Sequence, residues 1–223
     1  MKILAQMPED PLQYVEALED AEMELERMDR NTMRISEIIS EMMEYYQMNQ
    51  TIQQETIDLN HVIQTDASIL KADMDIKHSI QLDMDLHEDP LPINARANEI
   101  SQIFMNLVTN ARDALMQADK KEITVRSGVT GLNGNDTAWF EVEDCGPGIP
   151  DHIVERFGEP FVSSKQNDAE ARKRGSGTGL GIYMVKQILN KLNGDLRLET
   201  KPGRTLFRIS FPLDTDADMQ DVA

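Results

Sequence analysis

Apolar residues recur every seven positions through the first fifty residues of the chain. A narrow, long stripe of this kind is typical of a coiled-coil or helical-bundle seam, because one helix alone has nothing to bury it against. Asp10-Pro11 is a good helix start, and the polar stretch Gln47–Gln54 ends the pattern. The two series of the repeat are Leu18, Leu25, Thr32, Ile39 and Tyr46, and Tyr14, Ala21, Met28, Ile35 and Met42.

This seam predicts that residues 1–54 form a helical dimerisation region and that the chain is a homodimer. An amphipathic helix packed on its own domain is the alternative. From Glu55 the pattern changes to alternating helices and strands, which continue to residue 213. We expect residues 55–213 to form one α/β domain. Residues 214–223 form a short acidic tail that we expect to fray.

Within residues 55–213, apolar spacing of three and four predicts the helices, and apolar–polar alternation predicts the strands. The helices are expected at Leu59–Met74, at Asn98–Ala118 and after Gly179. Turn-forming residues at Gly128–Asp136 and at Pro202-Gly203 indicate two hairpins. The strands are expected at Ile80–Leu86, Ile123–Val125, Ala138–Val142, Asp195–Glu199 and Thr205–Phe211, with a short extended piece between Pro90 and Pro92.

Composition narrows the function classes. The formal net charge of −18 over 223 residues argues against non-specific binding to nucleic acid or to an anionic membrane surface. The single cysteine, Cys145, allows no internal disulfide. No apolar run is long enough to span a membrane, and the N-terminus lacks the apolar core of a signal peptide. We therefore expect a soluble, cytoplasmic protein. One basic cluster stands out, Lys165 with Arg172–Arg174.

Three glycines at alternate positions precede the last predicted helix, Gly175, Gly177 and Gly179, and Gly181 follows two residues on. Glycine permits positive φ and lets backbone N–H groups approach a ligand closely. The start of a helix adds unpaired N–H groups and the positive end of its dipole, which together favour a phosphate. This stretch is a candidate phosphate site, and a flexible linker before a helix is the alternative. It is not a P-loop, because no Gly-Lys-Ser/Thr follows.

Two asparagines lie one helical turn apart in the predicted helix Asn98–Ala118. Asn106 and Asn110 therefore share one side of that helix. Burying an amide group costs free energy unless the group forms hydrogen bonds or binds a ligand. A carbonyl oxygen is a suitable ligand for a hard cation such as Mg²⁺. Either asparagine alone could instead be satisfied by neighbouring backbone.

Two more motifs follow predicted secondary structure. Asp144–Pro150 comes directly after a strand, where a carboxylate can accept a hydrogen bond from an exocyclic amine. Its glycines would leave room for a flat ring, although Asp-x-Gly-x-Gly could also be an ordinary turn. In Phe157–Lys165, two aromatic residues bracket a turn ahead of a polar, basic loop.

In this order and spacing, the four motifs resemble the ATP-binding catalytic domain of sensor histidine kinases, members of the superfamily shared with gyrase, MutL and the heat-shock chaperones. The resemblance covers roughly Glu55 to Leu213, and Glu159–Lys165 looks most like the nitrogen-regulation type. It implies the α/β fold class. The architecture that it implies is a two-layer α/β sandwich (the Bergerat ATP-binding fold), with a mixed sheet on one face and three helices on the other. Here a long N-terminal dimerisation helix would precede it.

The resemblance also implies ATP and Mg²⁺ as cofactors. Asn110 would coordinate Mg²⁺, and Asn106 would contact the phosphates or the metal, so these two are the implied catalytic residues. Asp144 would bind the adenine amine. The other implied nucleotide-binding residues are Gly146, Gly148, Ile149, Phe157, Phe161, Lys165, Gly177, Thr178, Gly179, Leu180 and Gly181. The last glycines would form the phosphate cradle and the hinge of a mobile lid over Phe157–Thr178, with Arg172–Arg174 on or beside that lid.

Two departures bear on the chemistry. Where hydrolytic members of the superfamily carry a glutamate base, this chain has Asn106, which favours phosphoryl transfer to a protein group over ATP hydrolysis. Many family kinases have a basic residue three positions after the second asparagine, but here that position is Asp113. One expected phosphate contact is therefore in doubt.

The phosphoacceptor is the larger departure. Met28–Met48 resembles the second helix of the family's dimerisation and phosphoacceptor hairpin, but the first helix with its histidine is not recognisable. None of the four histidines lies on the heptad helix: they are His61, His78, His87 and His152. The resemblance implies a protein-histidine kinase core of a two-component system, acting on a histidine-bearing phosphoacceptor and through a response regulator. A serine/threonine kinase of the anti-sigma-factor type and an ATP-gated interaction module are the alternatives.

Overall fold

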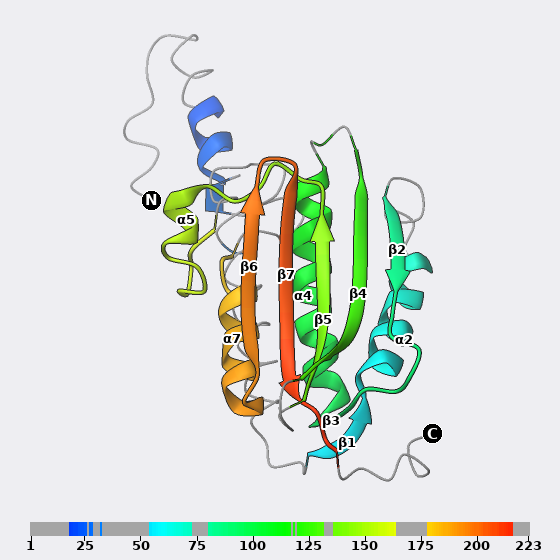
Figure 1. Ribbon diagram of the computed structural model, residues 1–223. Helices are drawn as coiled ribbons and strands as arrows, with labels where there is room; N and C mark the ends of the chain where they lie inside the picture. The colour runs from blue at the N-terminus through cyan, green and yellow to red at the C-terminus, as the bar shows by residue number, and fades with distance from the viewer. Residues whose placement is uncertain are drawn as a thin grey trace, which may run out of the picture.

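The computed structural model describes residues 18–25, 27–28, 32, 54–72, 80–116, 118, 120–131, 136–163 and 178–215. From residue 54 onward, these residues form two layers, a five-stranded sheet and a set of helices packed on one of its faces (Figure 1). This arrangement confirms the expected two-layer α/β sandwich.

The strands of the large sheet follow the spatial order β2-β4-β5-β7-β6. β2 runs parallel to β4, and every other neighbouring pair is antiparallel, so the sheet is mixed. All five strands match predicted ones, although several are longer; Gly128, expected in a turn, lies within β4. The strands are β2 (Gln81–Asp85), β4 (Glu122–Thr130), β5 (Thr137–Asp144), β6 (Asp195–Lys201) and β7 (Arg204–Pro212).

Helix α4 (Ala97–Leu115) lies at the centre of the helical layer, with α2 (Leu59–Ala72) and α7 (Gly181–Leu192) beside it (Figure 1). Its predicted apolar face is buried, from Ile100 through Leu115. Burial of these side chains supplies most of the driving force that holds the layers together. The helix ends three residues earlier than predicted.

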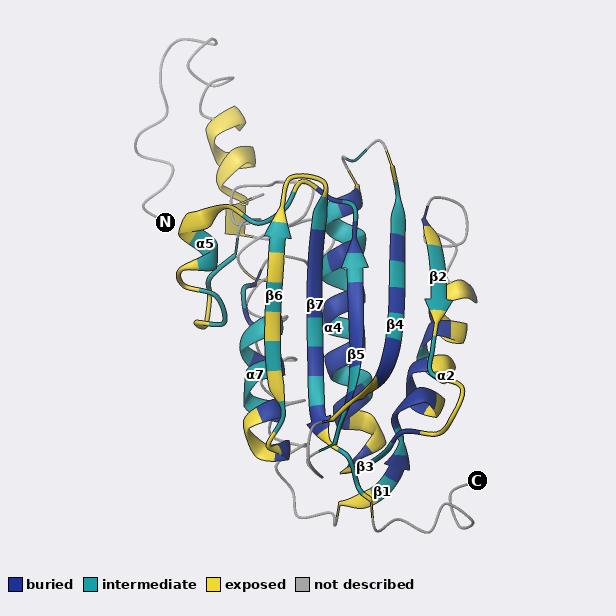
Figure 2. Ribbon diagram, in the orientation of Figure 1, coloured by how far each residue is buried: buried dark blue, intermediate teal, exposed yellow. Residues whose placement is uncertain are grey.

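The packing orders the sheet as well as the helices. The Phe104 ring of α4 meets Phe140 of β5 edge to face, with ring centroids 6.2 Å apart. Figure 2 shows buried residues alternating with partly exposed ones along β5 and β7, because one face of the sheet is covered by helices and the other is open. The contact between the two rings fixes α4 relative to β5.

A small antiparallel sheet of β1 (Glu55–Asp58) and β3 (Pro92–Ala95) was not predicted as such. Its first strand leads directly into α2. At this junction, Asp58 Oδ1 accepts hydrogen bonds from the N–H groups of Asn60 (3.0 Å) and Leu91 (2.9 Å). Asp214, the first residue of the expected tail, donates its backbone N–H to the Pro92 carbonyl at 2.8 Å. Its carboxylate also accepts a hydrogen bond from Thr56 at 2.8 Å.

The N-terminal region is described only in part. Residues 18–25, 27–28 and 32 are helical, and the remaining seam positions of the predicted dimerisation helix lie outside the described residues. Three seam residues are more than half exposed in the single chain: Leu18 (69%), Leu25 (64%) and Met28 (57%). Among the described helices, none is both long and apolar enough to cross a membrane. A short helix, α5 (Asp151–Val154), precedes the phenylalanine-containing turn.

Candidate functional site

Two of the predicted motifs meet where α4 passes the first turn of α7. The Asn106 amide nitrogen donates to the Gln102 carbonyl at 3.0 Å. Its Oδ1 faces the first residue of α7 and lies 2.7 Å from the position that a Cβ atom on Gly181 would take. Only glycine fits at this crossing without displacing the asparagine. The amide oxygen therefore sits beside a helix start whose N–H groups have no partner within the helix.

Asn110 lies one turn further along α4 and is half-buried. Within the described residues, no hydrogen bond to its side chain is found, so its amide oxygen remains a candidate ligand. Amide oxygens are suitable ligands for Mg²⁺, and the residue fits the predicted role by its chemistry. No group of three or more His, Cys, Asp or Glu side chains in the described ranges could hold a metal ion. A Mg²⁺ ion here would take most of its ligands from water and phosphate.

Asp144 is the last residue of β5, and its side chain is 4% exposed in relative terms. One carboxylate oxygen accepts the backbone N–H of Gly146 at 2.8 Å. A Cβ atom on Gly146 would lie 2.7 Å from that oxygen and 3.1 Å from the side chain of Ala114 on α4. The loop after β5 thus fits closely between the sheet and α4, and the carboxylate is held in a fixed orientation.

The rest of this loop is anchored by the β6–β7 hairpin. Gly148 has a φ of +85°, and a Cβ atom there would approach the Lys201 carbonyl oxygen to 2.8 Å. The N–H of Ile149 donates to Thr200 Oγ1 at 2.8 Å, and the N–H of Gly203 donates to the Gly146 carbonyl at 3.0 Å. Sequence analysis did not identify Thr200, because nothing in the sequence indicates that a threonine 51 residues away contacts this loop.

The phenylalanine-containing turn is in backbone contact with the glycine-rich segment. Phe161 has a φ of 65° and is half-exposed, and its N–H donates to the Gly179 carbonyl at 3.0 Å. Gly179 has a φ of +75°, and a Cβ atom on it would lie 2.6 Å from the Phe161 carbonyl carbon. At the other end of the turn, Phe157 stacks on Phe207 of β7 at 5.8 Å. The phenylalanine-containing turn and the glycine-rich segment therefore lie next to each other.

The described part of the glycine-rich segment begins at Thr178. The N–H of Leu180 donates to Thr178 Oγ1 at 3.3 Å, and the N–H of Met184 donates to the Leu180 carbonyl at 2.9 Å as the first bond of α7. Thr178 and Leu180 are both buried. Lys165, Gly177 and Arg172–Arg174 lie outside the described residues, so the structure places neither the basic cluster nor most of the expected lid.

A buried ion-pair network joins the far ends of the two site helices. Glu99 on α4 is fully buried and accepts hydrogen bonds from Arg96 (2.5 Å) and from Lys191 near the end of α7 (2.6 Å). Burial alone would raise the pKa of Glu99, but the hydrogen bonds from the two cations outweigh it and lower the pKa. The two helices are thus held together at two places, here and where Asn106 meets Gly181.

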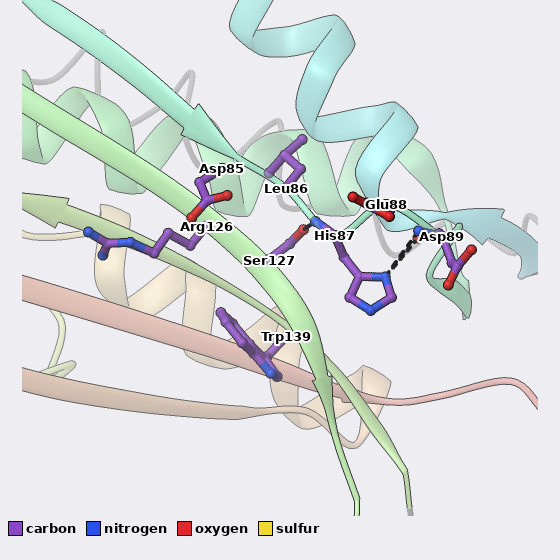
Figure 3. Close-up of a pocket in the computed structure, with 8 residues that line it drawn as sticks. All are labelled: Asp85, Leu86, His87, Glu88, Asp89, Arg126, Ser127 and Trp139. Atoms are coloured by element: carbon purple, nitrogen blue, oxygen red, sulfur yellow. Dashed lines mark hydrogen bonds between the residues drawn. The ribbon is translucent and has the colours of Figure 1, made fainter.

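A separate pocket of about 350 Å³ lies at the end of β2, against β4 and β5 (Figure 3). Ser127 accepts the N–H of His87 there at 2.9 Å, and Trp139 packs beneath the guanidinium of Arg208 at 4.2 Å. None of the predicted nucleotide-binding residues lines this pocket, so we do not place the nucleotide in it. Its lining residues are Asp85, Leu86, His87, Glu88, Asp89, Arg126, Ser127 and Trp139.

Comparison with known protein families gives a match over the region that holds the site. The sequence profile described as "Histidine kinase-, DNA gyrase B-, and HSP90-like ATPase" matches residues 95–215, more than half of the chain. The match begins just before α4 and ends after β7, so it includes every described candidate residue.

Individual relatives point the same way. "Sensory histidine kinase/phosphatase NtrB" of Rhodobacter capsulatus is 37% identical over 129 residues, which are 55% of this chain and 34% of that protein. "Sensor kinase CckA" of Brucella abortus is 29% identical over 193 residues, 82% of this chain and 19% of that protein. The chain therefore spans about a third or less of the length of these two relatives.

Solved structures share the fold. The "Mycobacterial sensor histidine kinase MprB" superposes with a TM-score of 0.56 over 72% of this chain and 97% of that one. Its sequence identity is 22%, so the likeness concerns the fold alone.

Proposed function

Because the chain belongs to the histidine kinase-, DNA gyrase B- and HSP90-like ATPase family, we propose that it binds Mg-ATP and is the catalytic core of a protein-histidine kinase. The observation that carries this proposal is the approach of Asn106 to Gly181, which brings an amide oxygen to the start of α7. The similarity to kinases named NtrB and CckA supports a role in a two-component system.

The adenine end of the nucleotide is assigned to the loop after β5. The buried Asp144 carboxylate accepts the N–H of Gly146, and a carboxylate has the acceptor capacity to receive the adenine amino group as a further donor. A hydrogen bond to a charged group contributes about 1.5–3 kcal/mol, and its direction would distinguish adenine from guanine, which carries a carbonyl at that ring position. Gly148 and Ile149 are held by the β6–β7 hairpin and would form the wall beside the base.

The phosphate chain is assigned to the segment from Thr178 to Gly181. The first turn of α7 offers unpaired N–H groups and the positive end of the helix dipole. Gly179 and Gly181 have no side chains to obstruct an approaching phosphate. Asn110 would hold Mg²⁺ through its amide oxygen, and Asn106 would contact the phosphates or the metal; the bound ion would neutralise charge on the phosphate oxygens.

The proposed reaction is transfer of the γ-phosphoryl group to an imidazole nitrogen of the acceptor. That nitrogen forms a bond to the γ-phosphorus, the bond from phosphorus to the bridging oxygen breaks, and ADP leaves. The attacking nitrogen is the unprotonated one, and the proton on the other ring nitrogen then passes to water, which leaves a neutral phosphoimidazole ring. Asn106 cannot act as a base to activate water, since an amide does not accept a proton at neutral pH. Its presence at this position supports transfer rather than hydrolysis.

We propose that the acceptor histidine lies on a partner of the two-component system and is none of the four histidines of this chain. His61 lies on α2 and His152 on α5, and both are exposed, while His87 contacts Asp89 beside the pocket of Figure 3. His78 lies outside the described residues. The exposed seam residues Leu18, Leu25 and Met28 support the further proposal of a homodimer.

Calorimetric titration with ATP, with and without Mg²⁺, tests the binding step. We expect ATP to bind and Mg²⁺ to strengthen that binding. In Asn110→Ala, the strengthening by Mg²⁺ should be largely lost, because the variant removes the amide ligand. A wild-type chain that does not bind ATP would overturn the proposed function.

A further inference from the structure

We propose that Lys186 is a positioning residue for the phosphate end of the nucleotide site. It fixes the turn Phe157–Phe161 against α7, and that turn sets the backbone of Gly179. This inference rests on the proposed function, since it concerns the same nucleotide. Lys186 itself lies on the second turn of α7 and reaches a backbone carbonyl, so it is not assigned any contact with ATP.

Three contacts hold the Lys186 side chain in place. Its Nζ donates to the Phe157 carbonyl at 2.6 Å and lies 5.2 Å from the centroid of the Phe157 ring. Gly158, with a φ of +80°, provides the space: a Cβ atom there would lie 2.5 Å from Nζ. Because the half-buried Lys186 side chain contacts a carbonyl, an aromatic face and a glycine, it is held in one conformation.

The turn that Lys186 holds is attached at its other end to the glycine-rich segment. The N–H of Phe161 donates to the Gly179 carbonyl, and the backbone atoms of Phe161 leave no room for a Cβ atom on Gly179. The turn Phe157–Phe161 is therefore bonded to α7 through Lys186 and to the residue just before α7 through Gly179. Stacking of Phe157 on Phe207 fixes the same turn to the sheet.

Loss of the Lys186 contact should weaken binding of the phosphates and leave binding of the adenine base unchanged. Gly179 has a positive φ, and the Phe161 backbone lies where a Cβ atom on Gly179 would stand, so the two backbones are closely fitted. Without the Lys186 contact, the turn can move away from α7, and the N–H groups near Gly179 lose their orientation toward a phosphate. Asp144 is anchored separately, through Gly146 and the β6–β7 hairpin, so adenine binding should not change.

The test compares two ligands in the full chain: Mg-ATP by calorimetry, and radiolabelled adenosine by equilibrium dialysis. In Lys186→Met, we expect the Kd for Mg-ATP to rise about tenfold, because the misplaced N–H groups near Gly179 would lose about one hydrogen bond to a charged phosphate. The Kd for adenosine should stay within about twofold of wild type. Lys186→Arg keeps the charge and a donor, and should recover part of the ATP affinity. Gly158→Ala would place a methyl group where the Lys186 side chain lies. It should therefore weaken binding of Mg-ATP but not of adenosine, as Lys186→Met does.

Lys191→Met is the matched control, because Lys191 is on the same helix and donates at the same distance, but to Glu99. It should lower the thermal midpoint without changing the ratio of the ATP and adenosine affinities. Equal losses for both ligands in Lys186→Met, no loss for either, or the same change of ratio in Lys191→Met would overturn the inference. Absence of ATP binding by wild type would instead overturn the proposed function, and this inference with it.

Discussion

The amide oxygen of Asn106 and the α-carbon of Gly181 are so close that a Cβ atom on Gly181 would lie 2.7 Å from that oxygen. These residues are seventy-five positions apart in the sequence, on different helices, and belong to different motifs. The contact joins the proposed metal side of the site to the proposed phosphate side. It also predicts that a larger residue at the start of α7 would displace the Asn106 side chain.

Gly181→Ala should therefore weaken nucleotide binding without unfolding the protein. Alanine in a helix is favoured over glycine by about 1 kcal/mol, which offsets part of the steric cost. The added methyl group must displace Asn106, so we expect the Kd for Mg-ATP to rise at least about tenfold. Calorimetry measures the affinity, and thermal unfolding should show a midpoint within a few degrees of wild type. Asn190→Ala, an exposed change on the same helix, should leave both quantities unchanged.

Asp144→Asn tests the adenine contact. The variant keeps the size of the side chain but replaces an acceptor and its charge with an amide, and the loss of a charge-assisted hydrogen bond costs about 1.5–3 kcal/mol. We expect the affinity for Mg-ATP to fall at least about tenfold, as measured by calorimetry. Glu143→Gln is the control, because Glu143 is the adjacent residue of β5 but pairs with Arg126 and Arg204. Unchanged affinity in Asp144→Asn would remove this carboxylate from base recognition.

The regular parts of the fold could be predicted because each local pattern agrees with the final packing. In α4, the spacing from Ile100 to Leu115 predicted the buried face that the structure shows. The two hairpins followed from Gly128–Asp136 and Pro202-Gly203 in the same way. The β1–β3 sheet was missed because four-residue strands such as Glu55–Asp58 carry too little alternation to predict.

The candidate site was predictable only where its residues lie in one local motif. Asn106 and Asn110 share a helix face, and Asp144 and Gly146 are bonded to each other, so their spacing carried the information. Thr200 and Lys186 reach the site from elsewhere in the chain, through bonds to backbone atoms of Ile149 and Phe157. A side chain that binds a distant backbone group leaves no periodicity or motif in the sequence. Only the tertiary structure identifies such residues.

The network around Glu99 predicts a specific dependence of stability on pH. The pKa of Glu99 is lowered in the folded chain, so its contribution is present above the unfolded-state pKa of about 4.3 and is lost as the pH falls through the folded-state value. Glu99→Gln should lower the free energy of unfolding by about 2–3 kcal/mol at pH 7. Urea denaturation at pH 7, 5, 4 and 3 should show this difference shrinking below about pH 4.

Some pH dependence should remain in that variant, because the pKa of Glu143 is also lowered: burial would raise it, but hydrogen bonds from Arg126 and Arg204 prevail. A gap between wild type and Glu99→Gln that stays constant from pH 7 to pH 3 would show that the carboxylate is not ionised in the network.

The exposed seam predicts self-association. Leu18, Leu25 and Met28 are each more than half exposed in the single chain, and a paired helix would cover them. Sedimentation equilibrium at concentrations on the order of tens of micromolar should give a dimer. Leu25→Glu places a charge in the seam and should give a monomer, whereas Glu24→Gln beside it should not. A wild-type monomer at these concentrations would favour a helix packed on its own domain.

The most direct test of the proposed function is transfer of labelled phosphate. Wild-type chain is mixed with Mg²⁺, ATP labelled at the γ-phosphate, and a separate protein that carries the histidine helix of a sensor kinase. We expect label on the added protein that is lost in acid but retained in base, little or no label on this chain, and no transfer with Asn110→Ala. Acid-stable label would contradict transfer to histidine, and stoichiometric acid-labile label on His61, His78, His87 or His152 would contradict the assignment of the acceptor to a partner.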